Sequence, residues 1–400
     1  MDRTAMNSRA PNELGQIFNL QKLFTAFEIF AFSMLLVHFK RHFTNAEIVL
    51  GYIVLFATPL PFILFARKIR TKAFLVAAFA IRLVCIFVYL ARPTLPVMLL
   101  YYFGNGLIIF YFWVPYNIRY FLLSHSSKRA TSAGHLIVVG PILNTVVPLA
   151  SGLVIARLGI AYLVTSASIL GVILIYKATR LPGLDIPYTF GDVLKRSHGL
   201  RFLKFIQGIW EAGNMAIPLY GLRFLQGELQ FGTYLSYLGL VGVVGALIVS
   251  RFSDRQARRL KYFFPFVMAL ALLTMALSWA ETLGRWTVLS GLVSVASTMT
   301  YPFLFAIVLD KIEDKAGGMI AREFMLNSGR VLGYAVMLAL LVATGSMRWW
   351  FLFTGAALLV YPILLVAKKL YVEEDYHPLL AVTKVYSVPR DGLRRPTLRP

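Results

Sequence analysis

The chain is built from long apolar runs that alternate with short polar segments. Each run extends over roughly 17–25 residues, which is the length that an α-helix needs to cross the hydrocarbon core of a bilayer. The runs lack the strict alternation of half-buried strands, so helices are the favoured interpretation. The pattern predicts twelve membrane-spanning helices, at residues 20–38, 46–65, 73–90, 95–116, 132–155, 159–176, 203–222, 231–249, 264–280, 287–309, 321–344 and 349–367.

The composition agrees with a membrane protein and excludes an ordinary soluble one. Hydrophobic residues make up 58% of the chain and charged residues 14%, with a mean hydropathy of +0.70. Soluble domains contain about 45–50% apolar and about 25% charged residues. Lipid satisfies no backbone hydrogen bonds, so only helices or a closed barrel can span it, and barrel strands would give alternating segments of about ten residues. We therefore expect an all-α integral membrane protein.

The formal net charge of +22 comes from basic residues that lie in alternate loops. With residues at span edges assigned to the adjacent loop, the segments on the side of the N-terminus hold 31 Lys and Arg, and the six opposite loops hold 7. Basic loops stay in the cytoplasm, so both termini are expected there. A nucleic-acid-binding protein would instead gather its basic residues in one patch, so no nucleic-acid partner is expected.

Cys85 is the only cysteine and lies inside an apolar run. It can form neither a disulfide within the chain nor a Cys-based metal site, and no metal or other cofactor is expected. The polar start of the chain leads into the first span without the pattern of a cleavable signal peptide. We expect a multi-pass, monomeric protein of the cell (inner or plasma) membrane.

The longest internal polar stretch divides the chain into two halves of six spans each. The predicted parts are a cytoplasmic N-terminal segment at 1–19, a six-helix bundle at 20–176, a cytoplasmic linker at 177–202, a second six-helix bundle at 203–367 and a basic cytoplasmic tail at 368–400. This organisation predicts that the two halves are structurally equivalent.

A weak internal repeat supports the division. The first span of each half begins near a Lys and carries a single Glu near mid-membrane, Glu28 in one half and Glu211 in the other. The fourth span of each half has a Pro next to a Tyr, Pro115-Tyr116 and Tyr301-Pro302. These similarities are short, but they occur in the same order in both halves.

The loop after the span at 231–249 reads SRFSDRQARR. It resembles the G-x-L-x-D-R-x-G-R-R signature of the major facilitator superfamily, which lies at the cytoplasmic turn between the second and third helices of a half. Asp254, Arg255, Arg258 and Arg259 match it, and Ser250 stands at the first glycine. The resemblance implies twelve helices in two pseudo-symmetric six-helix bundles, no enzymatic activity, and a charge-assisted cytoplasmic gate formed by these residues.

The corresponding loop of the first half keeps mainly the basic part of the signature. Arg67 and Arg70 are present, while Ala66 stands at the position of the Asp. We expect both arginines to belong to the gate. The alternative is that the two loops are ordinary basic loops of the cytoplasmic side.

Two further segments are similar to motifs of this superfamily. Gly140-Pro141 resembles the start of the G-P-x-x-G-G motif of exporters, with Asn144 at the first of the two final glycines. Tyr102 and Asn105 stand where an R-x-x-Q-G motif has its Arg and Gln. Asn105, Tyr102, Asn144 and Tyr301 are therefore candidate residues of the transport cavity.

Ionisable residues inside spans indicate function, because each costs about 2.5–3.5 kcal/mol in hydrocarbon and must face protein or water. The first helix of each half lines the central cavity in this fold, so Glu28 and Glu211 should face it from opposite sides. Gln207 and Asn214 lie at i−4 and i+3 from Glu211 and extend a polar stripe on its helix. Arg330, also mid-span, completes this candidate set.

We expect Glu211 to carry a coupled proton, with Glu28 as the second candidate. Burial disfavours an ionised carboxylate, which allows such a group to exchange protons. The alternative is a structural Glu paired with Arg82 or Arg330. Arg82 belongs to the third helix, which is peripheral in this fold, so a structural role is expected for it.

These observations predict a secondary transporter that exports a small organic, amphipathic or lipid-like solute by proton-coupled alternating access. Its partners would be the solute, protons and the lipid bilayer. Import of a sugar, organic acid or amino acid is the first alternative, and a non-transporting membrane scaffold of the same fold is the second. Neither a phosphate-binding G-x-x-x-x-G-K-[ST] motif nor a cluster of metal-binding acids supports an ATP-driven pump or an enzyme.

Overall fold

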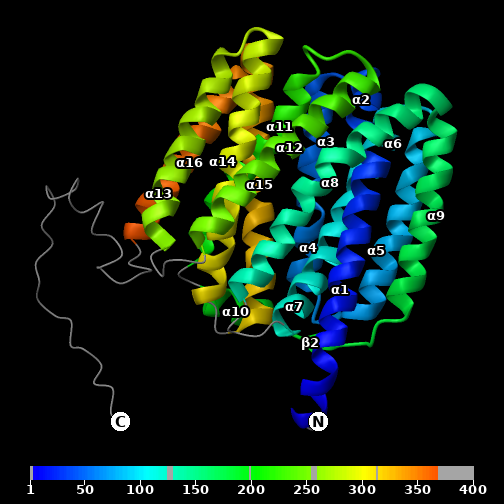
Figure 1. Ribbon diagram of the computed structural model, residues 1–400, viewed down its shortest axis with the longest axis vertical. Helices are drawn as coiled ribbons and strands as arrows, with labels where there is room; N and C mark the ends of the chain where they lie inside the picture. Colours follow the sequence, from blue (N-terminus) through cyan, green and yellow to red (C-terminus); the bar gives the residue numbers. More distant parts are fainter. Residues whose placement is uncertain (1–2, 124–128, 198–199, 254–258, 312–313, 368–400) are drawn as a thin grey trace, which may run out of the picture.

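The computed structural model describes residues 3–123, 129–197, 200–253, 259–311 and 314–367. Almost all of these residues are helical, and the long helices run side by side as a bundle (Figure 1). The N-terminus lies at the end of the bundle that also carries β2 (Asp185–Pro187) and α10 (Phe190–Arg196). We call this end the N-terminal face and the other end the opposite face.

The first half supplies six long helical segments, several of them interrupted by a short turn. They are α1 (Arg3–Phe32) with α2 (Leu35–Lys40), α3 (Asn45–Ala57) with α4 (Pro59–Phe65), α5 (Thr71–Ile86) with η1 (Phe87–Tyr89), α6 (Leu95–Ile108) with η2 (Ile109–Trp113) and α7 (Val114–Leu123), α8 (Arg129–Leu158), and α9 (Ile160–Thr179).

The second half repeats this arrangement with fewer interruptions. Its six segments are α11 (Arg201–Gly221), α12 (Gly227–Ser253), α13 (Arg259–Ala276) with η5 (Leu277–Trp279), α14 (Leu283–Lys311), α15 (Lys315–Thr344) and α16 (Arg348–Ala367).

Within the described ranges, nine segments are long and apolar enough to cross a membrane. α13 contributes to a shorter apolar stretch at Phe263–Trp279. α11 carries Arg201, Lys204 and Glu211, whose charges lower its hydropathy. Together with α14, these segments account for the twelve predicted spans.

Several helices begin earlier than the sequence predicted, and α1 and α15 differ most. α1 starts at Arg3 rather than at residue 20, so the N-terminal segment is helical, and Ile17 is buried in the core. α15 starts at Lys315 rather than at 321, because the side chain of Asp314 accepts a hydrogen bond from the Gly317 amide at 3.1 Å and caps the helix. A hydropathy window misses the start of α1 because its first turns are mostly polar, and it places the start of α15 late because that helix follows a charged segment.

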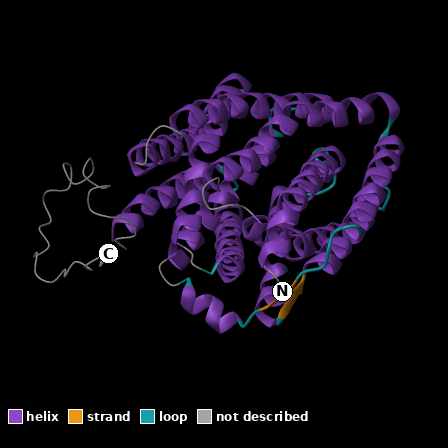
Figure 2. Ribbon diagram, turned by 60° about the horizontal axis from the view of Figure 1, so that its bottom comes forward, coloured by secondary structure: helices purple, strands orange, loops and turns teal. Residues whose placement is uncertain are grey.

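A small antiparallel sheet joins the first half to the linker, which the sequence did not predict. β1 (Lys68–Arg70) pairs with β2, with Ile69 opposite Ile186 (Figure 2). The Lys68 ammonium lies 2.7 Å from the Asp185 carboxylate. α10 then packs against α15, with the rings of Phe190 and Phe324 4.7 Å apart between their centroids. The linker therefore contacts both halves at the N-terminal face.

The two halves meet mainly through α8 against α12 and α3 against α15. Gly239 of α12 allows α8 and α12 to approach closely, because a Cβ at this position would lie 2.4 Å from the carbonyl carbon of Asn144. On the opposite face, a bidentate ion pair connects the halves, with Arg41 Nη1 2.7 Å from Glu228 Oε1. The space left between these contacts holds the candidate site.

Candidate functional site: a central cavity with two ion pairs

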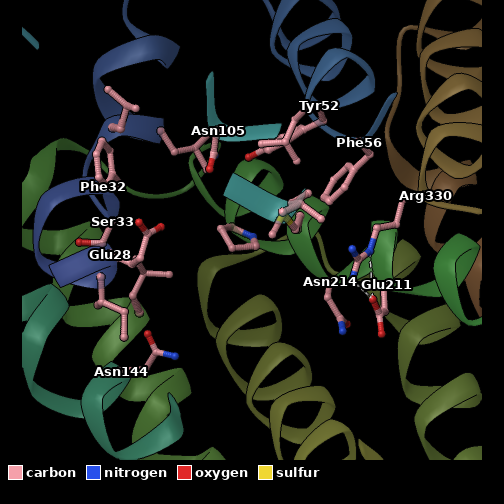
Figure 3. A pocket seen from close by; sticks show the side chains of 18 of the residues that line it. Glu28, Phe32, Ser33, Tyr52, Phe56, Asn105, Asn144, Glu211, Asn214 and Arg330 are labelled. Carbon is pink, nitrogen blue, oxygen red and sulfur yellow. Dashed lines mark hydrogen bonds and ion pairs between the residues drawn. The ribbon is translucent and has the colours of Figure 1, made fainter. Parts of the chain in front are cut away.

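A cavity of about 870 Å³ lies between the two halves (Figure 3). It extends from Phe39 and Phe231, near the opposite face, to Asn117 and Glu323, nearer the N-terminal face. Helices of both halves contribute to its walls, among them α1, α3 and α6 from the first half and α11, α12 and α15 from the second. This size is sufficient for a drug-sized molecule.

On the wall of the first half, Glu28 of α1 forms a bidentate ion pair with Arg82 of α5. The Arg82 guanidinium also lies over the ring of Phe32, 3.5 Å from its centroid, so an aromatic face covers its other side. Arg82 is therefore a direct partner of a cavity carboxylate. This agrees with the alternative in which Glu28 is paired with an arginine.

On the wall of the second half, Glu211 of α11 pairs with Arg330 of α15, with Nε 3.0 Å from Oε2 (Figure 3). Gln207 Nε2 donates a further hydrogen bond to Glu211 at 2.7 Å. The helices come close here because Gly208 faces Gly329, where a Cβ would lie 2.0 Å from the Phe205 carbonyl oxygen. Two glycines thus allow the charged pair to form.

Most of the cavity residues predicted from sequence line the cavity together. Asn214 and Tyr301 are joined by a 2.9 Å hydrogen bond from Nδ2 to the phenol oxygen. The exception is Gln207, which is buried behind Glu211 and does not line the cavity. Its carboxamide oxygen instead accepts a 2.6 Å hydrogen bond from the ammonium of Lys204. The predicted residues that line the cavity are Glu28, Tyr102, Asn105, Asn144, Glu211, Asn214, Tyr301 and Arg330.

Aromatic rings of α3 and α6 form another part of the wall and pack against Tyr334 of the second half. The ring of Tyr52 is 5.2 Å from that of Tyr102 and stacks on that of Tyr334 across the two halves at 5.0 Å, between centroids. Phe56 also stacks on Tyr334 and lies 5.0 Å from the Arg330 guanidinium carbon. These rings give the cavity an apolar surface between its two charged pairs.

Sequence reasoning missed a third charged pair near the N-terminal face. Arg322 and Glu323 form an ion pair on α15, and Asn117 Nδ2 of α7 lies 3.5 Å from Glu323. All three line the cavity. The predicted spans ended at residue 116 and began at 321, so these side chains were assigned to loops or span edges. Recognising the Asp314 cap would have placed Arg322 and Glu323 about two turns inside α15 rather than at a span edge.

The predicted gate is only partly described. Asp254, Arg255 and Arg258 lie outside the described residues, as do the side chains of Ser250 and Arg259. In the first half, the exposed side chains of Arg67 and Arg70 lie at the strand pair. The Arg67 carbonyl accepts a 3.0 Å hydrogen bond from the Tyr188 amide. This loop is therefore attached to the linker.

Among the described residues, no three His, Cys, Asp or Glu side chains are grouped so that they could hold a metal ion. The carboxylates of the cavity are instead each paired with an arginine. Ion pairing and hydrogen bonding are the interactions that these groups offer to a bound molecule.

Comparisons with known proteins identify the fold. The sequence matches no protein-family model and no curated protein. The crystal structure of the human organic anion transporter MFSD10 (TETRAN) is similar, with a TM-score of 0.67 and 13% identity, over 88% of this chain and 99% of that one. The chain has the major facilitator fold.

Two further transporters with this fold are similar over a comparable length. The E. coli fucose:proton symporter FucP has a TM-score of 0.62 and 14% identity, over 88% of this chain and 98% of its own. A POT family transporter in complex with 5-aminolevulinic acid has a TM-score of 0.63 and 12% identity, over 90% and 96%. The predicted major facilitator fold, with twelve helices in two six-helix bundles, is thereby confirmed.

Proposed function

We propose that this protein is a secondary transporter that exports a small amphipathic organic solute in exchange for protons. The central cavity would open alternately to the two sides of the membrane as the halves move relative to each other. A major facilitator fold hosts many substrates, so the cavity itself has to support any more detailed assignment.

The observation that carries the proposal is the position of Glu28 in the cavity wall. Its side chain is 25% exposed, and its only hydrogen-bond partner among the described residues is Arg82. When Glu28 is ionised, it can accept hydrogen bonds from a polar group of the solute. When it is protonated, that interaction weakens. Proton and solute would therefore compete for one carboxylate, which is the requirement for exchange.

The proposal assigns the coupled proton to Glu28, whereas the sequence favoured Glu211 for this role. Glu211 is 8% exposed and receives hydrogen bonds from Arg330 and Gln207. Several charge-assisted bonds stabilise the ionised carboxylate, and only a small part of its side chain reaches the cavity surface. In the proposal, Glu211 holds Arg330 in place.

Export is supported by the approximate Gly-Pro motif of α8, since Pro141 and Asn144 both line the cavity. The proposal also places the protein in the cell membrane with both termini in the cytoplasm. The basic loops lie on the same side of the membrane as the N-terminus, and basic loops stay in the cytoplasm. The N-terminal face would then be the cytoplasmic one.

Proteoliposomes with the purified full-length protein would test the coupling. A panel of labelled small amphipathic solutes is loaded, and transport is measured with and without a pH gradient. Glu28→Gln should still let the solute equilibrate down its own gradient. Its proton-driven accumulation of solute should fall at least about tenfold, because a neutral amide cannot take up the proton. Glu211→Gln should keep its response to the pH gradient.

The opposite result, in which Glu211→Gln loses coupling and Glu28→Gln keeps it, would return the proton to Glu211. Accumulation in the direction of the proton flow would show an importer. Absence of flux for all solutes in the parent protein, with the fold intact, would favour the scaffold.

A further inference from the structure

The two ion pairs present opposite charges to the central cavity. In the first half, the acid is the accessible partner: the Glu28 side chain is 25% exposed and that of Arg82 is 3% exposed. In the second half, the order is reversed, with Arg330 19% exposed and Glu211 8% exposed. Because the pairs lie on opposite walls, the cavity has a negative group on one side and a positive group on the other (Figure 3).

Arg330 has N–H donors that are not used by the described residues. A guanidinium carries five N–H donors. Its Nε and Nη2 donate to Glu211, and its Nη1 donates to Asn327 at 3.0 Å. One donor on each terminal nitrogen is left without a partner among the described residues. One N–H group on each terminal nitrogen allows the guanidinium to donate to the two oxygens of a carboxylate.

Glu28 has the complementary capacity. Arg82 donates one hydrogen bond to each of its two oxygens. A carboxylate offers about four lone-pair sites, so each oxygen can accept another bond. An ammonium group supplies up to three donors and a positive charge, and it would add to the Glu28–Arg82 pair without displacing Arg82.

The surface between the two charges is largely apolar. It is formed by the rings of Tyr52, Phe56 and Trp113 and by aliphatic side chains such as Leu235 and Leu238. A molecule that spans from Glu28 to Arg330 would place its middle against these groups. The third pair, Arg322–Glu323, is internally neutral and adds no net charge.

From this geometry we infer that the central cavity binds an amphipathic zwitterion, with its ammonium end at Glu28 and its carboxylate end at Arg330. The inference rests on the proposed transport function, for which it defines the substrate class. A solute with a single charge would leave either Glu28 or Arg330 with only its ion-pair partner and without a solute group on its cavity side. Because a charge-assisted hydrogen bond contributes about 1.5–3 kcal/mol, each missing end should weaken binding about 10- to 100-fold.

Calorimetric titration of the purified protein in nanodiscs would test this. The probes are unbranched ω-amino carboxylic acids of about four to twelve carbons, a range that scans the unknown span between the charges. Each is compared with the carboxylic acid and the amine of equal length. We expect one or more lengths at which the zwitterion binds at least about tenfold more tightly than both analogues.

Variants locate the two ends. Glu28→Gln should weaken binding of the zwitterion and the amine but not of the carboxylic acid. Glu211→Gln/Arg330→Gln should weaken binding of the zwitterion and the carboxylic acid but not of the amine; the double change avoids leaving Glu211 unpaired. Glu281→Gln, which alters an exposed carboxylate outside the cavity, is the matched control and should change no affinity.

The inference is wrong if either singly charged series binds as tightly as the zwitterions, or if no probe of any length binds. Because binding is measured without a pH gradient, this result is independent of coupling. A zwitterion preference that persists in a protein without proton-driven transport would support the inference and reject only the proposed exchange.

Discussion

Several buried charges in the described part of the protein lie next to an opposite charge. Glu28 has Arg82, Glu211 has Arg330, and the almost fully buried Arg119 has Glu13 as well as the Pro182 carbonyl oxygen at 2.7 Å. A single ion inside a low-dielectric region is costly, and the loss of one partner leaves the other charge without compensation. The Glu28–Arg82 and Glu211–Arg330 pairs are therefore needed for stability, and they also place charged groups at the cavity wall.

Arg82→Leu should destabilise the protein strongly, by about 3–5 kcal/mol, because it leaves the Glu28 carboxylate unpaired beside Phe32. Glu28→Gln/Arg82→Leu should recover most of that loss, since both charges are removed. Thermal unfolding in detergent, followed by the loss of monodisperse protein, would measure the difference. Equal stability of the single and the double variant would show that the unpaired Glu28 carboxylate is not the cause of the loss.

At the scale of helices, the site depends on how closely α11 and α15 approach. The residues at their contact are glycines, and a Cβ on Gly208 would lie 2.2 Å from the Leu326 carbonyl oxygen. Small residues at such contacts let helix backbones pack tightly inside a membrane. The same approach brings Glu211 and Arg330 into hydrogen-bond distance. Helix spacing and site chemistry are thus set by the same residues.

Gly329→Ala should lower stability by about 1–3 kcal/mol, because the new methyl group would force the two helices apart. Gly140→Ala is the matched control: it also lies inside a helix, but no heavy atom lies within 4 Å of its added Cβ. The control should be neutral or gain up to about 1 kcal/mol from the helix preference of alanine. Parallel thermal melts would compare them, and an equal effect of both changes would refute close packing as the cause.

At the scale of the whole molecule, contacts between the halves occur at both ends of the cavity. Arg41 and Glu228 connect the halves at the opposite face, and the linker contacts both halves at the N-terminal face through β1, β2 and α10. Alternating access requires that contacts at one end break while those at the other end form. The ion pair is suited to this, because Arg41 is half exposed and an exposed pair contributes only about 0.2–1 kcal/mol.

Glu228→Gln should therefore shift the population toward states that are open at the opposite face, by up to about fivefold. Spin labels at the exposed positions Arg92 and Arg285, one in each half, would report the separation by pulsed electron spin resonance. The control is Glu281→Gln, since the Glu281–Arg348 pair lies within one half. A distance distribution that matches the parent in Glu228→Gln would reject a gating role for Arg41–Glu228.

Hydropathy and charge were sufficient to predict the twelve helices, their division into two halves and the fold class. Crossing lipid is a local requirement: each span must be long and apolar by itself, whatever its neighbours are. Isolated charges such as Glu28, Glu211 and Arg330 were also informative as candidates, because an ionisable residue in a span is costly unless it has a partner. Helix ends were less predictable, since the start of α15 depends on capping by Asp314.

Only the packing of the helices determined which charges meet and which partner of each pair faces the cavity. Arg82 lies 54 positions from Glu28, and Arg330 lies 119 positions from Glu211, so no local pattern relates them. The reversed exposure of the two pairs depends on the distance between helices and on the rings that cover one side of each guanidinium. The joining of the linker to β1 is equally non-local. These features arise from contacts between distant segments, and they define the chemistry of the cavity.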